Sequence, residues 1–207
     1  MSKVAIVGDP SGTGTFTISA PNGNTDRTLV LPDEAGTVLT SGSPTVLPKG
    51  GPAFFAHESV RQTISGGTET VCVLDVKKFD TNGCFNNTAS TQILNGISVP
   101  SYAFAPNVAG YYQVNAQIRL ETFSQLNYHY TVLRLNGVRY KRMSEFYTNT
   151  VGNMQPVELT NTILIYLNGT SDYIQLAVEE NGSGTLQVGY QVFDYSNHFS
   201  AHLVRAA

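Results

Sequence analysis

The first residues of the chain include glycines and hydroxyl side chains of the kinds that bind phosphate. A short apolar run at residues 4–7 leads into GDPSGTGT at residues 8–15. A phosphate loop needs a second glycine five residues after the first and then a lysine, but Thr13 and Gly14 occupy these positions. The dinucleotide fingerprint fails because Thr17 replaces its last glycine. The residues that follow alternate as in a strand, whereas both loops open a helix. The sequence therefore argues against nucleotide binding.

Two of the four histidines, His198 and His202, could suggest a metal site. Four residues apart in a strand, they share one face but stand about 13 Å apart, too far to bind the same ion. Surface or interface positions are the alternative that we favour, although three symmetry copies could still bring side chains together around an axis. The sequence predicts no metal and no cofactor.

Hydrolytic chemistry finds no support either. The sequence contains no Gly-x-Ser-x-Gly motif. Glu179 and Glu180 are neighbours whose side chains point to opposite faces of a strand, so they cannot act as an acid and base on one substrate. We interpret them as a solvated strand end and expect no enzyme activity.

Four of the twelve basic residues cluster around the dipeptide Asn136-Gly137. These residues, which we take as candidate ligand contacts, are Arg134, Arg139, Lys141 and Arg142. They could contact an anionic host surface glycan or an acidic capsid surface. The alternative is a solvated edge hairpin whose charges prevent edge-to-edge pairing.

Six tyrosines could likewise contact a glycan or fill a subunit interface, and we favour the interface for most of them. They are Tyr111, Tyr128, Tyr130, Tyr147, Tyr190 and Tyr195.

The composition bounds the elements that must position these residues. Charged residues make up 13% of the 207, and the net charge of −3 provides no basic field for nucleic acid. No apolar run approaches the roughly 18 residues of a membrane span, so neither nucleic acid nor membrane insertion is expected. Two cysteines do not make a disulfide framework. Cys72, in TVCVLDV, is typical of a small buried side chain, and we expect free thiols.

The chain divides at SGSPTVLPKGGP, residues 41–52. Residues 1–45 are predicted to form an anchor or stalk, residues 46–52 a linker and residues 53–207 a head. The first segment has few apolar residues, so it cannot offset the roughly 1 to 2 kcal/mol of ordering cost per residue without partners. It must wind together with copies of itself or dock on another surface.

The sequence of the head predicts an antiparallel sandwich of eight or more strands. In GYYQVNAQIRLE the apolar side chains of Tyr112 and Val114 alternate with polar residues, as in a half-buried strand. Asn136-Gly137 between two strand-like runs predicts a tight hairpin. Further strands are expected at residues 161–167, 172–180, 184–194 and 198–204, besides PAFFAHESV and TVCVLDVKKFD.

The sequence FAPNVAGYYQVNA places Phe104, Gly110 and Tyr112 in a pattern that resembles the globular head of the q subunit of the first complement component. The order of PAFFAH, FDTNGCF, YLNGTSDYIQLAV and HFSAHLV is also similar to that family. The resemblance covers about residues 52–207. It departs from the family at Val114, where an aromatic is usual, and at Ala201-His202, where glycine-phenylalanine is usual. It implies a jelly roll, as in tumour-necrosis-factor ligands, that assembles as a trimer.

The sequence GTFTISAPNGNTDRTLVLPDEAGTVL resembles a short module of structural proteins of tailed bacteriophages, often found in fibres. The two resemblances together imply a non-enzymatic phage virion protein, a homotrimer on the virion surface that is assembled in the host cytoplasm. Its partner would be the major capsid protein or a tail protein. We favour a capsid decoration or cement protein. The alternative is a short tail fibre or receptor-binding protein that recognises a host surface glycan.

Two further sets of residues are assigned roles on this basis. Core or trimer packing is expected of Phe54, Phe79, Phe104, Gly110, Tyr112, Val114, Leu176, Phe199 and Leu203. Particle anchoring is expected of Phe16, Ile18, Leu29, Leu31 and Pro32.

Overall fold

The structure is a computed structural model of the 207-residue chain. It describes residues 10–15, 17, 22–26, 28, 51–123, 128–147, 156–182, 184–189 and 196–207, without the side chains of residues 122 and 123. The chain separates into two units, Met1–Thr40 and Ser41–Ala207. The predicted division into anchor, linker and head stays a prediction.

In the first unit, the described residues form a turn at residues 10–11 and bends at residues 22–25, and all of them are exposed in the single chain. The five residues assigned to particle anchoring lie outside the described residues.

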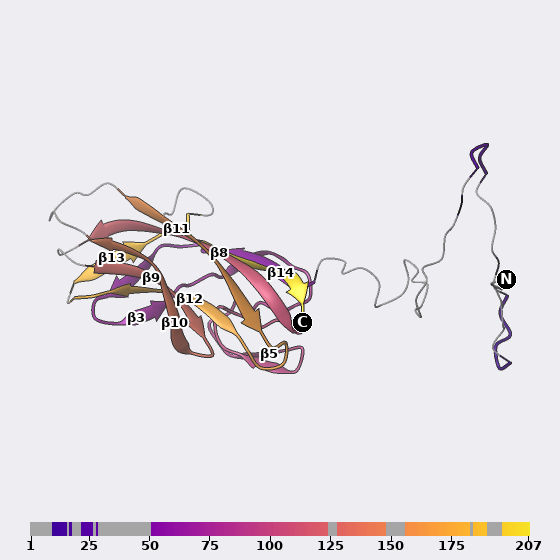
Figure 1. Ribbon diagram of the computed structural model, residues 1–207. Coiled ribbons are helices and arrows are strands. Elements are labelled where there is room, and N and C mark those ends of the chain that lie inside the picture. Colours follow the sequence, from indigo (N-terminus) through magenta and orange to yellow (C-terminus); the bar gives the residue numbers. More distant parts are fainter. Residues whose placement is uncertain are drawn as a thin grey trace. The chain divides into compact units, whose positions relative to one another are not determined.

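In the second unit, the described residues form strands and no helix (Figure 1). No helix of the described residues could cross a membrane. The strands are β1 (Ala53–His57), β2 (Gln62–Ser65), β3 (Glu69–Val71), β4 (Val76–Asp80), β5 (Gln92–Leu94), β6 (Ile97–Val99), β7 (Ala103–Phe104), β8 (Gly110–Phe123), β9 (Tyr128–Leu135), β10 (Val138–Tyr147), β11 (Val157–Leu167), β12 (Ile174–Glu180), β13 (Thr185–Val188) and β14 (His198–Ala206).

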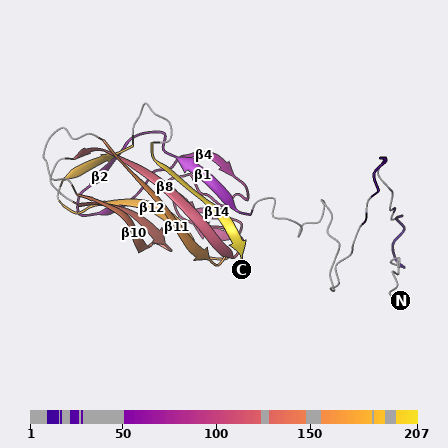
Figure 2. The same ribbon diagram turned by 45° about the horizontal axis from the view of Figure 1, so that its top comes forward.

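Two antiparallel sheets stack to form a jelly-roll sandwich (Figures 1 and 2). One has the order β2-β13-β8-β14-β1-β4, with β11 on the other edge of β8, and the second has the order β10-β9-β12-β3, with β7 also on β12. A separate ribbon pairs β5 with β6. The fold class expected from the sequence, an all-β antiparallel jelly roll, is confirmed.

The long strand β8 organises the seven-stranded sheet. One edge pairs with β11 along Gly110 to Leu120, and the other pairs with β14 and then with β13. Its inward side chains, Tyr112 and Val114 among them, are almost completely buried, while Tyr111 and Gln113 point outward. This is the predicted alternation.

Four phenylalanines from separate segments form the centre of the core. Phe54 stacks on Phe85 and Phe104, with ring centroids 4.4 and 4.6 Å apart, and meets Phe199 edge-on at 5.1 Å. All four are at most 1% exposed. Such aromatic pairs contribute about 0.5–1.5 kcal/mol each beyond the area that they bury.

Of the residues expected in the core or trimer packing, Phe54, Phe104, Gly110, Tyr112, Val114, Leu176 and Phe199 are buried and Leu203 packs against the core. A Cβ on Gly110 would lie 2.4 Å from the carbonyl oxygen of Arg205, so only glycine fits there. Phe79 is not a core residue of the single chain, because it is 50% exposed. The β1–β4 register pairs it with Phe55, on the outward side of the sheet.

The predicted hairpin is confirmed. Asn136 and Gly137 connect β9 to β10 with φ angles of 52° and 79°, which suits a turn whose two central residues have positive φ. The Asn136 side chain fixes the turn, since it donates to Asp172 at 2.8 Å and accepts from the backbone N–H of Tyr173 at 2.9 Å.

Most of the expected strands agree with the structure in place but not at every boundary. The single strand expected at TVCVLDVKKFD is wrong, because residues 72–75 are not in a strand and separate β3 from β4, which belong to different sheets. Those expected at residues 161–167 and 198–204 extend further, as Val157–Leu167 and His198–Ala206. The strand expected at residues 184–194 is described only as Thr185–Val188, because residues 190–195 lie outside the described residues.

Both cysteines are free, as expected, and both are buried, which was expected only of Cys72. Burial raises the pKa of Cys72, and it raises the pKa of Cys84 to about 11. Neither thiol is therefore a nucleophile at neutral pH.

The expectation that Glu179 and Glu180 form a solvated strand end is wrong for Glu180. The two side chains do point to opposite faces, but Glu180 points inward and is 0% exposed. It lies opposite His129 in the β9–β12 register, and His129 is buried as well. Burial lowers the pKa of His129 to about 4, so its imidazole is neutral at pH 7.

The phenylalanine cluster yields a stability prediction. Phe54→Ala should lower the free energy of unfolding by about 3–5 kcal/mol, because it leaves a cavity that three rings line. Urea unfolding should place Phe54→Leu between this variant and the wild type. Ile93→Ala, at a side chain that is 69% exposed, should change stability by less than about 0.5 kcal/mol. Equal losses for Phe54→Ala and Ile93→Ala would contradict the described core.

Candidate functional site

The jelly roll presents the outward face of each sheet as a candidate interaction surface. We call them the five-strand face and the seven-strand face. The five-strand face is made of Glu69, Tyr128, Tyr130, Arg134, Arg139, Arg142, Glu145, Tyr147 and Glu179. The seven-strand face is made of Phe55, Phe79, Tyr111, Gln113, Asn115, Arg119, Glu158, Thr162, Leu164, Tyr166, His198, His202 and Val204.

On the five-strand face, two carboxylates hold three arginines. Glu69 contacts Nε of Arg134 at 2.9 Å and Nε of Arg139 at 2.7 Å. Glu179 contacts Nη2 of Arg139 at 2.8 Å and Nη2 of Arg142 at 3.1 Å. The hydrogen bond with Glu69 raises the pKa of Arg139. The carboxylates thus compensate most of the arginine charge.

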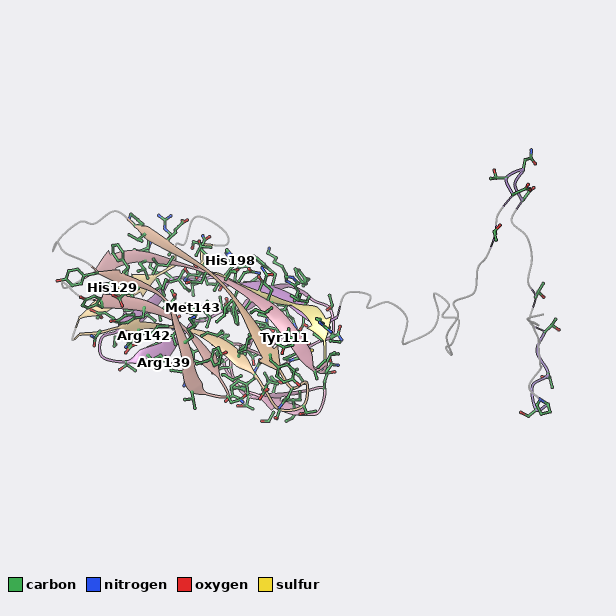
Figure 3. The ribbon with its side chains drawn as sticks, viewed as in Figure 1. Tyr111, His129, Arg139, Arg142, Met143 and His198 are labelled. Carbon is green, nitrogen blue, oxygen red and sulfur yellow. The ribbon has the colours of Figure 1, made fainter. Side chains whose placement is uncertain are left out.

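Only three of the four residues in the predicted basic cluster therefore lie together. The strand pairing brings Arg134, Arg139 and Arg142 together, and Figure 3 shows Arg139 and Arg142 side by side along β10. Lys141 is not part of the group, because β-bulges interrupt the register on both sides of it and it pairs with the core residue Leu133. Sequence reasoning did not identify Glu69 and Glu179 as partners of these arginines. The ion pairs depend on the pairing of strands that are far apart in the chain.

Three tyrosines continue this face beyond Arg142. The Arg142 guanidinium carbon lies 3.9 Å from the centre of the Tyr130 ring. The ring of Tyr128 stacks on Tyr130 at 6.2 Å and contacts that of Tyr147 at 4.7 Å. Tyr130 is 5% exposed, whereas Tyr128 and Tyr147 are 40% and 49% exposed. The exposed ring of Tyr128 thus rests on the buried ring of Tyr130 and in turn contacts Tyr147.

The seven-strand face exposes apolar side chains at its two sides. Tyr111 and Tyr166 are opposite each other in the β8–β11 register, with ring centroids 5.5 Å apart. Leu164 and Val204 are 56% and 54% exposed. On the other side, the ring of Phe55 stacks between Phe79 and His198, at 6.5 and 5.3 Å. Clustered exposure of large apolar side chains is typical of an interaction surface.

The middle and one end of the seven-strand face are polar. Thr162 donates to the Asn115 side chain, which also accepts from Gln113 at 3.4 Å. Toward the end of β8, Arg119 contacts Glu158 at 3.0 Å. The face therefore grades from aromatic to amide to ionic along β8.

The predicted metal candidates lie on the seven-strand face. His198 pairs with Gln117 and His202 with Gln113, so both point outward from β14, as their spacing predicts. In the described part of the chain, no group of three or more histidine, cysteine, aspartate or glutamate side chains could hold a metal ion.

Of the six tyrosines considered for glycan or interface contacts, the four that lie among the described residues divide between the two faces. Tyr111 lies on the seven-strand face, and Tyr128, Tyr130 and Tyr147 lie on the five-strand face. Tyr190 and Tyr195 lie outside the described residues.

No protein-family model matches the sequence, and no curated protein matches it. Among solved structures, the chain is similar to Eiger TNF from S. frugiperda at 13% identity, with a TM-score of 0.49 over 77% of this chain and 96% of that chain. It is similar to the globular domain of zebrafish complement 1qA protein at 16% identity, with a TM-score of 0.37 over 75% of this chain and 99% of that chain. For the PRD1 vertex protein P5, the identity is 13% and the TM-score is 0.42, over 75% of this chain and 99% of that chain.

The charge compensation on the five-strand face yields a second prediction. Replacing both carboxylates, as Glu69→Gln with Glu179→Gln, should release the arginines and create an anion site. We expect this variant to elute from a heparin column at clearly higher salt than the wild type.

The control for net charge is Asp26→Asn with Glu34→Gln, which removes the same number of charges from the first unit, Met1–Thr40. It should elute close to the wild type. If the two double variants elute together, net charge rather than the local pairing governs heparin binding.

Proposed function

We propose that the chain is a non-enzymatic structural protein of a bacteriophage virion, a homotrimer whose N-terminal segment anchors an exposed jelly-roll head. The observation that carries the trimer is the apolar content of the seven-strand face. Leu164, Tyr166 and Val204 are about half exposed in the single chain, and burial against copies of the same face would remove this surface from water.

The five-strand face is the less suitable surface for assembly. Burying Glu69, Glu179 and their arginines would remove several charges from water, and the desolvation penalty can exceed the gain from pairing. The seven-strand face offers aromatic rings, aliphatic side chains and amides instead, which is the composition of a subunit interface.

The phage origin and the anchoring role rest on the sequence. Residues 14–39 carry the pattern that resembles the phage structural module, and the segment is too poor in apolar residues to order itself. The docking partner that we propose is the major capsid protein or a tail protein, which places the head on the virion surface.

A capsid decoration or cement protein is the favoured role. Forty-five extended residues span at most about 150 Å, and a folded anchor spans far less. Such a reach suits a short knob or the terminal piece of a fibre. The second candidate, a receptor-binding protein, is favoured by the exposed tyrosines of the five-strand face. Copy number separates the two roles, since hundreds of copies per particle imply decoration and a few tens imply a tail organ.

The trimer is tested by charge placed on the seven-strand face. Leu164→Glu with Tyr166→Glu should give monomers in sedimentation velocity, because three copies would bring six carboxylates into the interface. The matched control is Val138→Glu with Tyr140→Glu on β10, whose side chains are 69% and 50% exposed and which should remain trimeric. A wild type that sediments as a monomer would refute the proposal.

Anchoring is tested by deletion of residues 1–45. The truncated protein should remain a soluble trimer but should no longer attach to particles that lack the protein, whereas the full chain should attach. Electron microscopy of labelled protein on purified particles measures both attachment and copy number. Attachment of the truncated head at the level of the full chain would show that residues 1–45 are not the anchor.

A further inference from the structure

The exposed tyrosines of the five-strand face lie at the end of the head opposite to its entry. The chain enters at Pro52, whose carbonyl accepts from the backbone N–H of Leu203, beside Gly110 and the end of β14. β9 begins at the other end with Tyr128, and Figure 3 shows the adjacent His129 far from Tyr111. A head anchored through its N-terminal segment would direct these tyrosines away from the particle.

The tyrosines are held in place by strand pairing and ring contacts. Tyr128 and Tyr147 are opposite each other in the β9–β10 register, so neighbouring strands fix both backbones. The buried ring of Tyr130 supports Tyr128, and the Arg142 guanidinium lies over the Tyr130 ring while Glu179 holds it. A surface that is already ordered loses little conformational entropy when it binds.

The charges of this face exclude an anion as the natural ligand. Arg139 and Arg142 direct guanidinium nitrogens at Glu179, and Arg139 also contacts Glu69. A sulfate, phosphate or uronate would have to displace a carboxylate that the protein already supplies. Carboxylates lying this close would also repel the incoming charge.

A neutral sugar fits the same arrangement. The C–H-rich face of a pyranose ring is apolar and packs on a tyrosine ring, while its hydroxyls both donate and accept hydrogen bonds. The Glu179 carboxylate accepts from a hydroxyl, and the Arg142 guanidinium donates to one, with the strength of charge-assisted bonds. No net charge is required of the ligand.

We propose that Tyr128, Tyr147, Arg142 and Glu179 form a binding site for neutral carbohydrate, the terminal hexose or N-acetylhexosamine of a surface glycan. The inference rests on the proposed function in one respect, that the anchored head presents this end outward. A single site of this shallow form binds weakly, and three copies per trimer raise the avidity about 10²-fold or more where the glycan is multivalent.

The test uses the full-length protein on an array of neutral hexose and N-acetylhexosamine oligosaccharides, together with sulfated, phosphorylated and uronate-containing ones. We expect binding to at least one neutral oligosaccharide that changes little between low and high salt. Tyr147→Ala and Tyr128→Ala should each weaken it about tenfold. The matched control is Tyr140→Ala on the same strand, whose side chain is 50% exposed and which should bind as the wild type does. Circular dichroism and thermal unfolding show that each variant is folded.

Three results would overturn the inference. They are no binding to any neutral oligosaccharide, binding to anionic oligosaccharides alone that high salt abolishes, and an equal effect of Tyr140→Ala and Tyr147→Ala. The proposed function fails separately. A trimer that attaches to particles but binds no neutral glycan refutes only the carbohydrate site, whereas a monomer that binds glycan through Tyr147 refutes only the trimer.

Discussion

The two-residue alternation of β8 is the constraint on which the rest of the structure depends. Three partners, β11, β13 and β14, take their register from this strand, so its pleat decides which of their side chains enter the core. A shift of one residue would exchange Tyr112 for Gln113 and bury a row of amides without partners. The exposed aromatic surface of the seven-strand face is the other consequence of the same register, because outward positions on β8 and β11 fall opposite each other.

The two outward faces differ in charge and in exposed apolar surface. On the five-strand face, ion pairs at the surface contribute little stability each, at most about 1 kcal/mol, but they fix the orientation of Arg142 and keep the surface solvated. On the seven-strand face, the exposed rings and Leu164 have no such compensation in the single chain. One face is therefore suited to remain in water and the other to be covered. A homotrimer that assembles through the second leaves the first accessible.

Local patterns in the sequence predicted the parts of the fold that depend on local physics. The alternation in β8 and the turn at Asn136-Gly137 depend on neighbouring residues alone, and both were predicted. The local pattern could not divide Phe79 between the core and a subunit interface, and its register with Phe55 puts it on the seven-strand face. Glu180 was misplaced, because a hydrophilic residue at a strand end gives no sign that the turn at residues 66–67 will lie against its carboxylate. The pairing of Glu69 with Arg139 depends on β3, β12, β9 and β10 being adjacent, which only the complete topology determines.

The position of the chain entry bears on the proposed anchor. The backbone N–H of Leu203 donates a hydrogen bond to the carbonyl of Pro52, and that of Ala207 donates to the carbonyl of Ala109. The chain entry and the end of the C-terminal strand therefore lie at the same end of the sandwich. In a trimer, the three entries would be held at fixed separations, and the three N-terminal segments would meet at a high effective concentration. Association of the heads would already bring these segments together, so their own association would lose less entropy. On the proposed function, a segment too poor in apolar residues to fold alone would thus become ordered, and the seven-strand face would be a condition for anchoring as well as for assembly.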